Sequence, residues 1–161
     1  MKAALFSAAI AVALVACGPV SAAELGRSGR AVKVVRVAPV NVFVAAEQGD
    51  PRAQTKIGFM YEYGRGLPQD YMLAAAWYRR AAEQGYSPAQ HLLGMMYNKG
   101  QGVAENYVTA HKWLNLAAAG AGPRDREYFL RIRDALTYKM TVAQQTEAQW
   151  RARHWYPVPE R

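Results

Sequence analysis

Cysteine is nearly absent from this chain. Cys17 is the only one among 161 residues, which excludes an intramolecular disulfide and any metal site built from several cysteines. His91, His111 and His154 lie far apart without the spacing of a ligand set, and no Ser-His-Asp arrangement can be assembled from the sequence. The sequence therefore predicts no metal site, no cofactor and no catalytic residues, and we expect the protein not to be an enzyme.

A hydrophobic run long enough to span a bilayer is also missing. The run near the N-terminus covers residues 3–16, about 14 residues where roughly 20 are needed. Lys2 precedes it and the small residues of PVSAAE follow it, which is the layout of a secretory signal over residues 1–23. We therefore expect the chain to be exported from the cytoplasm.

Two ways of processing this signal stay open. Small residues before Ala22 or Ala23 suit an ordinary signal peptidase, which would release a periplasmic or secreted protein. The stretch LVAC, which ends at Cys17, resembles the bacterial lipobox, in which the cysteine is lipidated and becomes the new N-terminus. We expect the periplasm or the outer membrane, as a lipoprotein, in preference to secretion.

Acidic residues are outnumbered in this sequence. It has 20 Lys and Arg against 12 Asp and Glu, a formal net charge of +8. Residues 24–40 are predicted to form a basic linker that carries Arg27, Arg30, Lys33 and Arg36. Further arginines are spread along the later part of the chain, at Arg79, Arg80, Arg124, Arg126, Arg131, Arg133, Arg151 and Arg153. In an exported protein this charge favours anionic lipid headgroups, lipopolysaccharide or an acidic protein over nucleic acid.

What the sequence does contain is a tandem repeat. The phrase AAEQGDPRAQ begins at Ala45, and AAEQGYSPAQ begins 36 residues later at Ala81. Residues 45–80 and 81–116 align without gaps. Their matched pairs include Gly58 with Gly94, Tyr61 with Tyr97, and Trp77 with Trp113. Self-similarity at a fixed period of this size is typical of a solenoid, in which each unit packs on its neighbours.

Each repeat carries two helix patterns. The first runs from about Pro51 to Glu62 and can be capped by Asp50, while the second follows Asp70 in one copy and Asn106 in the other. Apolar residues recur along one side of both helices: Ala53, Ile57 and Tyr61 in the first, and Tyr71, Ala74, Trp77 and Ala81 in the second. Ala53 and Gly58 are expected to lack bulk where a partner helix comes close.

Glycine pairs separate the two helices of each repeat. They read GRG at residues 64–66 and GQG at residues 100–102. Neither follows a strand pattern, and neither has the form of a phosphate-binding loop. We therefore expect glycine to end the first helix in a left-handed conformation and to turn the chain.

Partial repeats flank the two full ones. Residues 42–48 look like the end of a second-type helix, and residues 123–161 suit two capping helices, of which the later begins with a capping box of Thr141 and Gln144. Because about three repeats are needed for a stable solenoid, we expect the C-terminal helices to be integral to the fold.

The motif L-G-x-x-Y appears as Ile57-Gly58-x-x-Tyr61 and Leu93-Gly94-x-x-Tyr97, as in the tetratricopeptide class. With a period of 36, G-x-G between the helices and AAEQG after them, the chain resembles the Sel1-like repeat family over residues 41–122. The resemblance implies an all-α fold: a short α-solenoid of tetratricopeptide-like helix-turn-helix repeats with a C-terminal helical cap. It also implies a non-catalytic adaptor of the bacterial cell envelope. Some cysteine-rich members bind or hydrolyse β-lactams, but this chain lacks their cysteines.

In a solenoid the first helix of each repeat lines the concave face, where partners bind. Positions that differ between the copies and point away from the apolar stripe are the candidate contacts with a protein or peptide: Lys56, Phe59, Tyr63, His91, Leu92, Met95 and Lys99. A simpler alternative is that Phe59, Leu92 and Met95 bury against a neighbouring helix. A different hypothesis is that the arginine-rich cap binds an anionic envelope polymer, peptidoglycan or lipopolysaccharide. A hydrolase is the third and weakest hypothesis, and the membrane is expected to be contacted only through a lipid anchor.

The lipobox interpretation of Cys17 leads to a direct experiment. Metabolic labelling with a palmitate analogue is expected to mark the wild-type protein, because a lipidated cysteine carries the acyl chain, and to leave Cys17→Ser unmarked. The readout is in-gel fluorescence of the purified protein. If neither protein is labelled, the signal is removed by ordinary cleavage and the protein has no lipid anchor.

Overall fold

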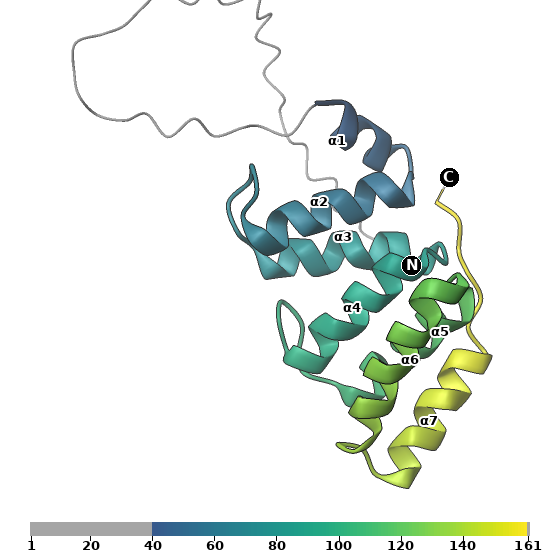
Figure 1. The fold of residues 1–161 in the computed structure, drawn as a ribbon. Helices are drawn as coiled ribbons and strands as arrows, with labels where there is room; N and C mark the ends of the chain where they lie inside the picture. Colours follow the sequence, from purple (N-terminus) through teal and green to yellow (C-terminus); the bar gives the residue numbers. More distant parts are fainter. Residues whose placement is uncertain (1–39, 161) are drawn as a thin grey trace, which may run out of the picture. The chain divides into compact units, whose positions relative to one another are not determined.

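A computed structural model of the chain describes residues 40–160. These residues form seven α-helices and, within that range, no strand: α1 (Val40–Glu47), α2 (Pro51–Tyr63), α3 (Tyr71–Glu83), α4 (Ser87–Lys99), α5 (Tyr107–Gly120), α6 (Pro123–Thr137) and α7 (Val142–Arg153). Helices α1 to α6 pack on one another in chain order, so the predicted all-α repeat fold is confirmed (Figure 1). The predicted signal, Cys17 and all of the predicted linker except its last residue lie outside the described residues; that residue, Val40, opens α1.

The helices begin where capping side chains were predicted. The Asp50 carboxylate accepts a hydrogen bond from the Arg52 N–H at 2.9 Å, and Asp70 accepts from two N–H groups at the start of α3. Asn106 caps α5 in the same way. Thr141 and the Gln144 side chain form the expected capping box of α7. Each cap satisfies N–H groups that have no partner inside the helix.

The glycine pairs end the first helix of each repeat, as predicted. Gly64 has φ 63° and Gly100 has φ 64°, both in the left-handed region that glycine adopts without a steric penalty. The N–H of each glycine donates to a carbonyl of the preceding turn, Met60 O in α2 and Met96 O in α4. These turns bring the second helix back against the first.

In each copy of the ten-residue phrase, the side chain of the last residue donates a hydrogen bond to the backbone of the second. Gln54 and Gln90 are the tenth residues of the two copies, and both are buried. The side-chain amide of Gln54 donates to the Ala46 carbonyl at 3.0 Å, and that of Gln90 donates to the Ala82 carbonyl at 3.1 Å. Each glutamine therefore satisfies a carbonyl at the end of the preceding helix, which gives the repetition of the phrase a structural reason.

The two helices of a repeat meet where one of them has no side chain. A Cβ placed on Gly58 would lie 2.6 Å from the Tyr78 ring, and one on Gly94 would lie 3.0 Å from the Leu114 side chain. Tyr78 and Leu114 are fully buried. The close approach predicted at Gly58 is therefore confirmed, but the apolar stripes predicted for α3 and α5 did not include Tyr78 and Leu114, the side chains that it admits.

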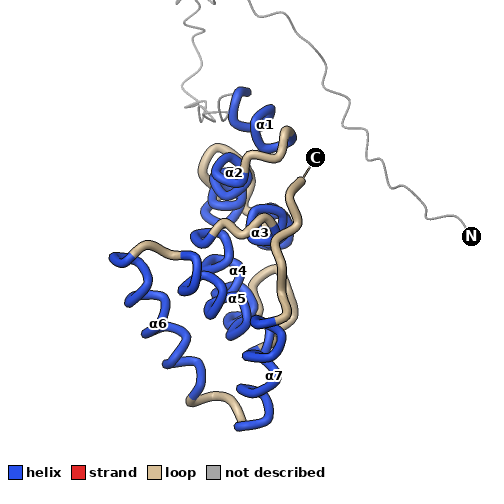
Figure 2. The backbone as a smooth tube through the Cα atoms, turned by 90° about the vertical axis from the view of Figure 1, so that its right-hand side faces the viewer, coloured by secondary structure: helices blue, strands red, loops and turns tan. Residues whose placement is uncertain are grey.

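Helix α6 continues the repeat. Pro123 opens it 36 residues after Ser87 opens α4, and its Phe129 occupies the register of Leu93. Helix α7, which follows it, does not pair with α6 as the second helix of a repeat would, because α7 packs on α5 and makes almost no contact with α6. Figure 2 shows α6 and α7 apart, with α5 between them. Leu136, Met140 and Ala148 of this region bury against α5, so the C-terminal helices are part of the fold.

After α7 the chain turns back along the repeats. Residues 155–160, here named the strap, run past α5 and α3 toward α1 (Figure 1). They contain neither helix nor strand. Among residues 40–160, no helix combines the length and the hydropathy needed to cross a bilayer.

The close approach at Gly58 predicts a loss of stability on adding one methyl group. We expect Gly58→Ala to lower the free energy of unfolding by about 1–3 kcal/mol through overpacking, although alanine favours a helix over glycine by about 1 kcal/mol. The reason is that the Tyr78 ring is fully buried and its hydroxyl donates to Glu62 at 2.7 Å, so the ring has no room to move. Urea unfolding followed by circular dichroism measures the change.

The matched control is Lys56→Ala, an exposed position of the same helix. It should change the free energy of unfolding by no more than about 0.5 kcal/mol. A Gly58→Ala protein as stable as the control would show that the two helices do not depend on this contact.

Candidate functional site

The first helix of the first repeat, α2, presents an aromatic pair to solvent. Phe59 and Tyr63 lie one turn apart on α2, with ring centroids 4.4 Å apart and exposed fractions of 36% and 52%. The Arg65 guanidinium lies over both rings, 5.2 Å from the centroid of Phe59 and 5.8 Å from that of Tyr63. Lys56 is exposed one turn earlier. The structure therefore brings three of the predicted contact residues together on one helix.

The predicted contact residues of α4 lie in different surroundings. The His91 ring stacks on Phe129 of α6 at 4.5 Å and lies 5.6 Å from the Tyr128 ring, so α6 covers much of it. Leu92 is half-buried and packs against the main core, and Met95 is also half-buried. Lys99 is exposed at the end of the helix. On α4 the predicted residues are therefore split between packing and solvent.

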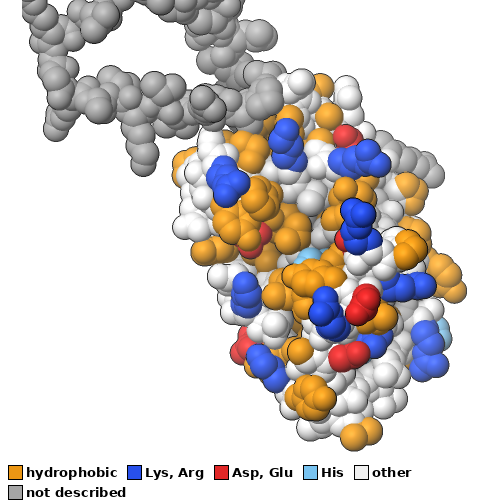
Figure 3. Space-filling model, in the orientation of Figure 1, with side chains coloured by type: hydrophobic (Ala, Val, Ile, Leu, Met, Phe, Trp, Pro, Cys, Tyr) orange, Lys and Arg blue, Asp and Glu red, His pale blue; other side chains and the backbone are white. Residues whose placement is uncertain are grey.

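Figure 3 shows one face of the molecule, on which hydrophobic side chains gather and Lys and Arg lie among them. Tyr128 of α6 is exposed, as is the aromatic pair of α2. Here the set of Lys56, Phe59, Tyr63 and Arg65 is named the aromatic patch. It joins large apolar side chains to positive charge.

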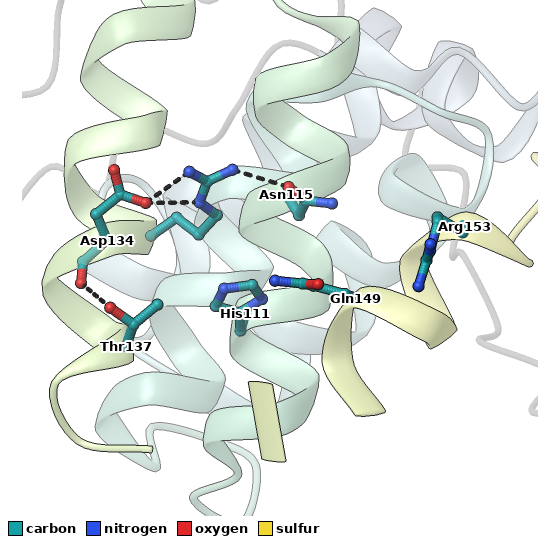
Figure 4. Close-up of a pocket in the computed structure, with 7 residues that line it drawn as sticks. His111, Asn115, Asp134, Thr137, Gln149 and Arg153 are labelled. Atoms are coloured by element: carbon teal, nitrogen blue, oxygen red, sulfur yellow. Dashed lines mark hydrogen bonds and ion pairs between the residues drawn. The ribbon is translucent and has the colours of Figure 1, made fainter. Parts of the chain in front are cut away.

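A second candidate site lies in the cap. Because α6 and α7 pack on α5 and not on each other, a pocket of about 310 Å³ opens between the three helices (Figure 4). Its lining is almost entirely polar: His111, Asn115, Arg133, Asp134, Thr137, Gln149 and Arg153.

Arg133 is fixed in this pocket by its neighbours. Its Nε and one terminal nitrogen donate to Asp134 at 2.9 and 2.6 Å, and the other terminal nitrogen donates to Asn115 at 3.0 Å (Figure 4). In the repeat register, Arg133 stands where α2 and α4 carry Tyr61 and Tyr97. The third unit thus has a charged side chain at a position that is aromatic in the other two.

His111 lies at the base of the pocket with little access to solvent. Its side chain is 2% exposed, and its Nδ1 has no hydrogen-bond partner within the described residues. Burial lowers the pKa of His111 below its ordinary value, and the charge of Arg133 lowers it further while Asp134 opposes this. The pocket therefore offers an uncharged imidazole beside guanidinium and amide groups, which suits hydrogen bonding to a small polar group.

In the sequence His111 stands as one isolated histidine, and the pocket around it was not predicted. Arg133 in place of the repeated tyrosine was the available signal, because a charged residue at a packed position needs polar neighbours. The pocket lining includes neither serine nor cysteine. Within residues 40–160, no cluster of three His, Cys, Asp or Glu side chains could hold a metal ion.

The lowered pKa of His111 predicts a pH dependence of stability. The unfolded chain takes up a proton near pH 6.5, whereas folded His111 stays neutral to lower pH. The unfolded state therefore binds more protons in this window, and the contribution of His111 to stability is lost as the pH falls below about 6.5. Urea unfolding from about pH 7.5 to pH 5 should show a shallower decline for His111→Gln than for the wild type. If the free energy of unfolding falls equally with pH in both proteins, the prediction is wrong and His111 lies in a solvated site.

Solved structures of bacterial repeat proteins are similar to this chain. One is c5321, a protective antigen of uropathogenic Escherichia coli strains that displays an SLR fold, with 35% sequence identity and a TM-score of 0.64. The match covers 69% of this chain and 23% of that one, so this chain spans less than a quarter of its length. Another is a Sel1 repeat protein from Oxalobacter formigenes, with 42% identity and a TM-score of 0.52, covering 56% of this chain and 68% of that one.

The family comparison finds two successive repeats in the chain. The Sel1 repeat matches residues 51–86 and 87–121, each of which begins at a first helix of the structure. No curated protein matches the chain. With these matches, the Gly58 and Gly94 contacts and the left-handed glycines between paired helices, the chain belongs to the Sel1 repeat family.

Proposed function

We propose that this protein is a non-catalytic adaptor that binds a partner protein or peptide through the aromatic patch. Sel1 repeats typically mediate protein interactions and are generally non-catalytic. The observation that carries the proposal is the exposed pair of Phe59 and Tyr63 with Arg65 over both rings. The few residues that carry most of the binding energy in protein interfaces are enriched in tryptophan, tyrosine and arginine.

The aromatic patch has the rigidity that a binding surface needs. Phe59 and Tyr63 project from α2, whose other side carries the buried Ile57 and Met60, so the helix itself is anchored in the core. Contact with each other and with Arg65 restricts the two rings further. Because little freedom is left to lose, contact with a partner requires little ordering of these side chains.

The charge around the patch favours an acidic partner. Three positive side chains are exposed on the first helices and their turns: Lys56, Arg65 and Lys99. None of the three forms an ion pair with another described residue. Positive charge at the edge of an interface speeds the encounter with a negative partner and excludes positive ones. We expect this partner in the bacterial cell envelope, to which the signal over residues 1–23 would deliver the protein.

An anionic envelope polymer is the second candidate partner. Three cap arginines are held by this chain: Arg126 by the Ala118 carbonyl, Arg133 by Asp134 and Arg151 by Glu147. Arg124, Arg131 and Arg153 are exposed and make no ion pair with another described residue. Peptidoglycan or lipopolysaccharide bound by these groups would be released by salt, because exposed charges are screened.

The aromatic patch is tested by a double substitution. Immobilised wild-type protein and Phe59→Ala/Tyr63→Ala are incubated with envelope extract, and the bound proteins are quantified by mass spectrometry. We expect recovery of the specific partner to fall at least about tenfold, because loss of two central aromatic contacts removes more than about 1.4 kcal/mol of binding free energy. Tyr138→Ala is the matched control, since Tyr138 is 92% exposed at the end of α6, outside the patch.

Partner recovery that is equal for the double variant and the control would refute the patch. Sedimentation of the protein with purified peptidoglycan or lipopolysaccharide over a salt series distinguishes the second candidate. Binding that is salt-sensitive and unchanged by Phe59→Ala/Tyr63→Ala assigns the function to the arginine-rich cap.

A further inference from the structure

The strap lies against a part of the molecule that the proposed function does not use. Pro157 and Pro159 fix their own φ angles and favour an extended conformation for the residues before them. The strap therefore crosses the repeats as an extended, proline-containing segment without helix or sheet hydrogen bonds of its own. It contacts two equivalent turns, one in each of two successive copies of the repeated phrase.

The first of these turns joins α3 to α4. The Val158 N–H donates to the Glu83 carbonyl at 2.7 Å, at the end of α3. Gly85 in this turn has φ 88°, and a Cβ on it would lie 3.5 Å from the Pro157 side chain. The Trp155 ring stands edge-on to Trp113, with centroids 5.8 Å apart and planes at 71°. Backbone and proline contacts thus coincide at this turn, and the aromatic contact is made beside it, to α5.

The second turn joins α1 to α2 and takes an acidic residue. Glu160 accepts hydrogen bonds from Nε and a terminal nitrogen of Arg80, both at 3.0 Å, and from the Gln54 amide at 2.7 Å. These bonds, with that of Arg80 the strongest, lower the pKa of Glu160 below its ordinary value. A Cβ on Gly49, which has φ 92°, would lie 3.3 Å from the Glu160 side chain. The carboxylate is therefore recognised by charge and by shape.

The spacing of the strap matches the spacing of the repeats. Gly49 and Gly85 occupy the same place in the repeated phrase, and the strap residues that meet them, Glu160 and Pro157, are three positions apart. Three residues of a polyproline-type segment advance about 9 Å. An extended proline-rich chain can therefore meet successive turns with every third residue.

We propose that the α1–α2 and α3–α4 turns form a binding site for an extended peptide of a partner protein, with an aromatic residue, a proline two positions later and an acidic residue three positions after that proline. The strap is the internal occupant of this site. Its outward side chains are largely free, since Tyr156 is 77% and Val158 66% exposed. A strand held along one edge can open locally without unfolding the helices, so an external peptide of the same chemistry can take its place.

The test uses the full chain and a fluorescein-labelled peptide HWYPVPE, which repeats residues 154–160. Trp155→Ala/Glu160→Ala weakens the internal strap and leaves the turns intact. Fluorescence anisotropy should show the peptide binding to this variant at least tenfold more tightly than to the wild type, whose site is occupied. Two control peptides, HWYPVPK without the acidic group and HWYAVAE without the prolines, should each bind the variant at least tenfold more weakly.

Absence of peptide binding to the folded variant up to about 1 mM would overturn the proposal, as would equal binding of all three peptides. Circular dichroism confirms that the variant is folded. If the double variant does not fold, Val158→Pro replaces it, because this change removes the N–H that donates to Glu83 and keeps Trp155 and Glu160. A wild-type protein that forms dimers through exchange of its strap would assign the site to a second copy and overturn the choice of a partner protein.

Discussion

The fold depends on the close approach of two helices at a glycine. Gly58 admits the Tyr78 ring in the first repeat, and Gly94 admits the Leu114 side chain in the second. Where the backbone of one helix receives a side chain of the next, the pair can bury an apolar face that neither helix could bury alone. The left-handed glycines at the ends of α2 and α4 serve the same contact, because they return the chain at the angle that this packing needs. Constraints on backbone and side chain therefore agree within each repeat.

The cap lacks this contact, and its helices pack differently. In the repeat register, α6 carries Leu130 at the position of Gly58 and Gly94, and a side chain there prevents the same close approach. Helix α7 packs on α5 instead, and the space between α6 and α7 is the polar pocket of His111 and Arg133. The third unit thus differs from the other two at both Leu130 and Arg133, and it has a solvent-accessible site where they have a helix interface.

Local features of the fold were predictable from the sequence, and contacts between distant residues were not. The caps at Asp50 and Thr141 and the turn at Gly64 depend on a few neighbouring residues, which a short sequence pattern contains. The close approach at Gly58 was predicted, but the Tyr78 ring that fills it was not, because which side chain of the partner helix lies there depends on how the two helices pack. The pocket needs α5, α6 and α7 together, and the strap joins Glu160 to Arg80 across 80 residues. Of the candidate contact residues, the pattern named three that the structure brings together on α2, but it could not show that Phe129 covers His91.

Two structural requirements restrict which residues the repeated phrase can carry at its tenth and fifth positions. Its tenth residue, Gln54 or Gln90, satisfies a helix-end carbonyl of its second residue, which holds the turn in place. Its fifth residue, Gly49 or Gly85, adopts positive φ and leaves room for a strand to approach. The first constraint alone accounts for the glutamine. The glycine is needed for two reasons, because a side chain there would strain the turn and would also crowd the strap. The turn that joins the repeats is therefore also the surface on which an extended chain lies.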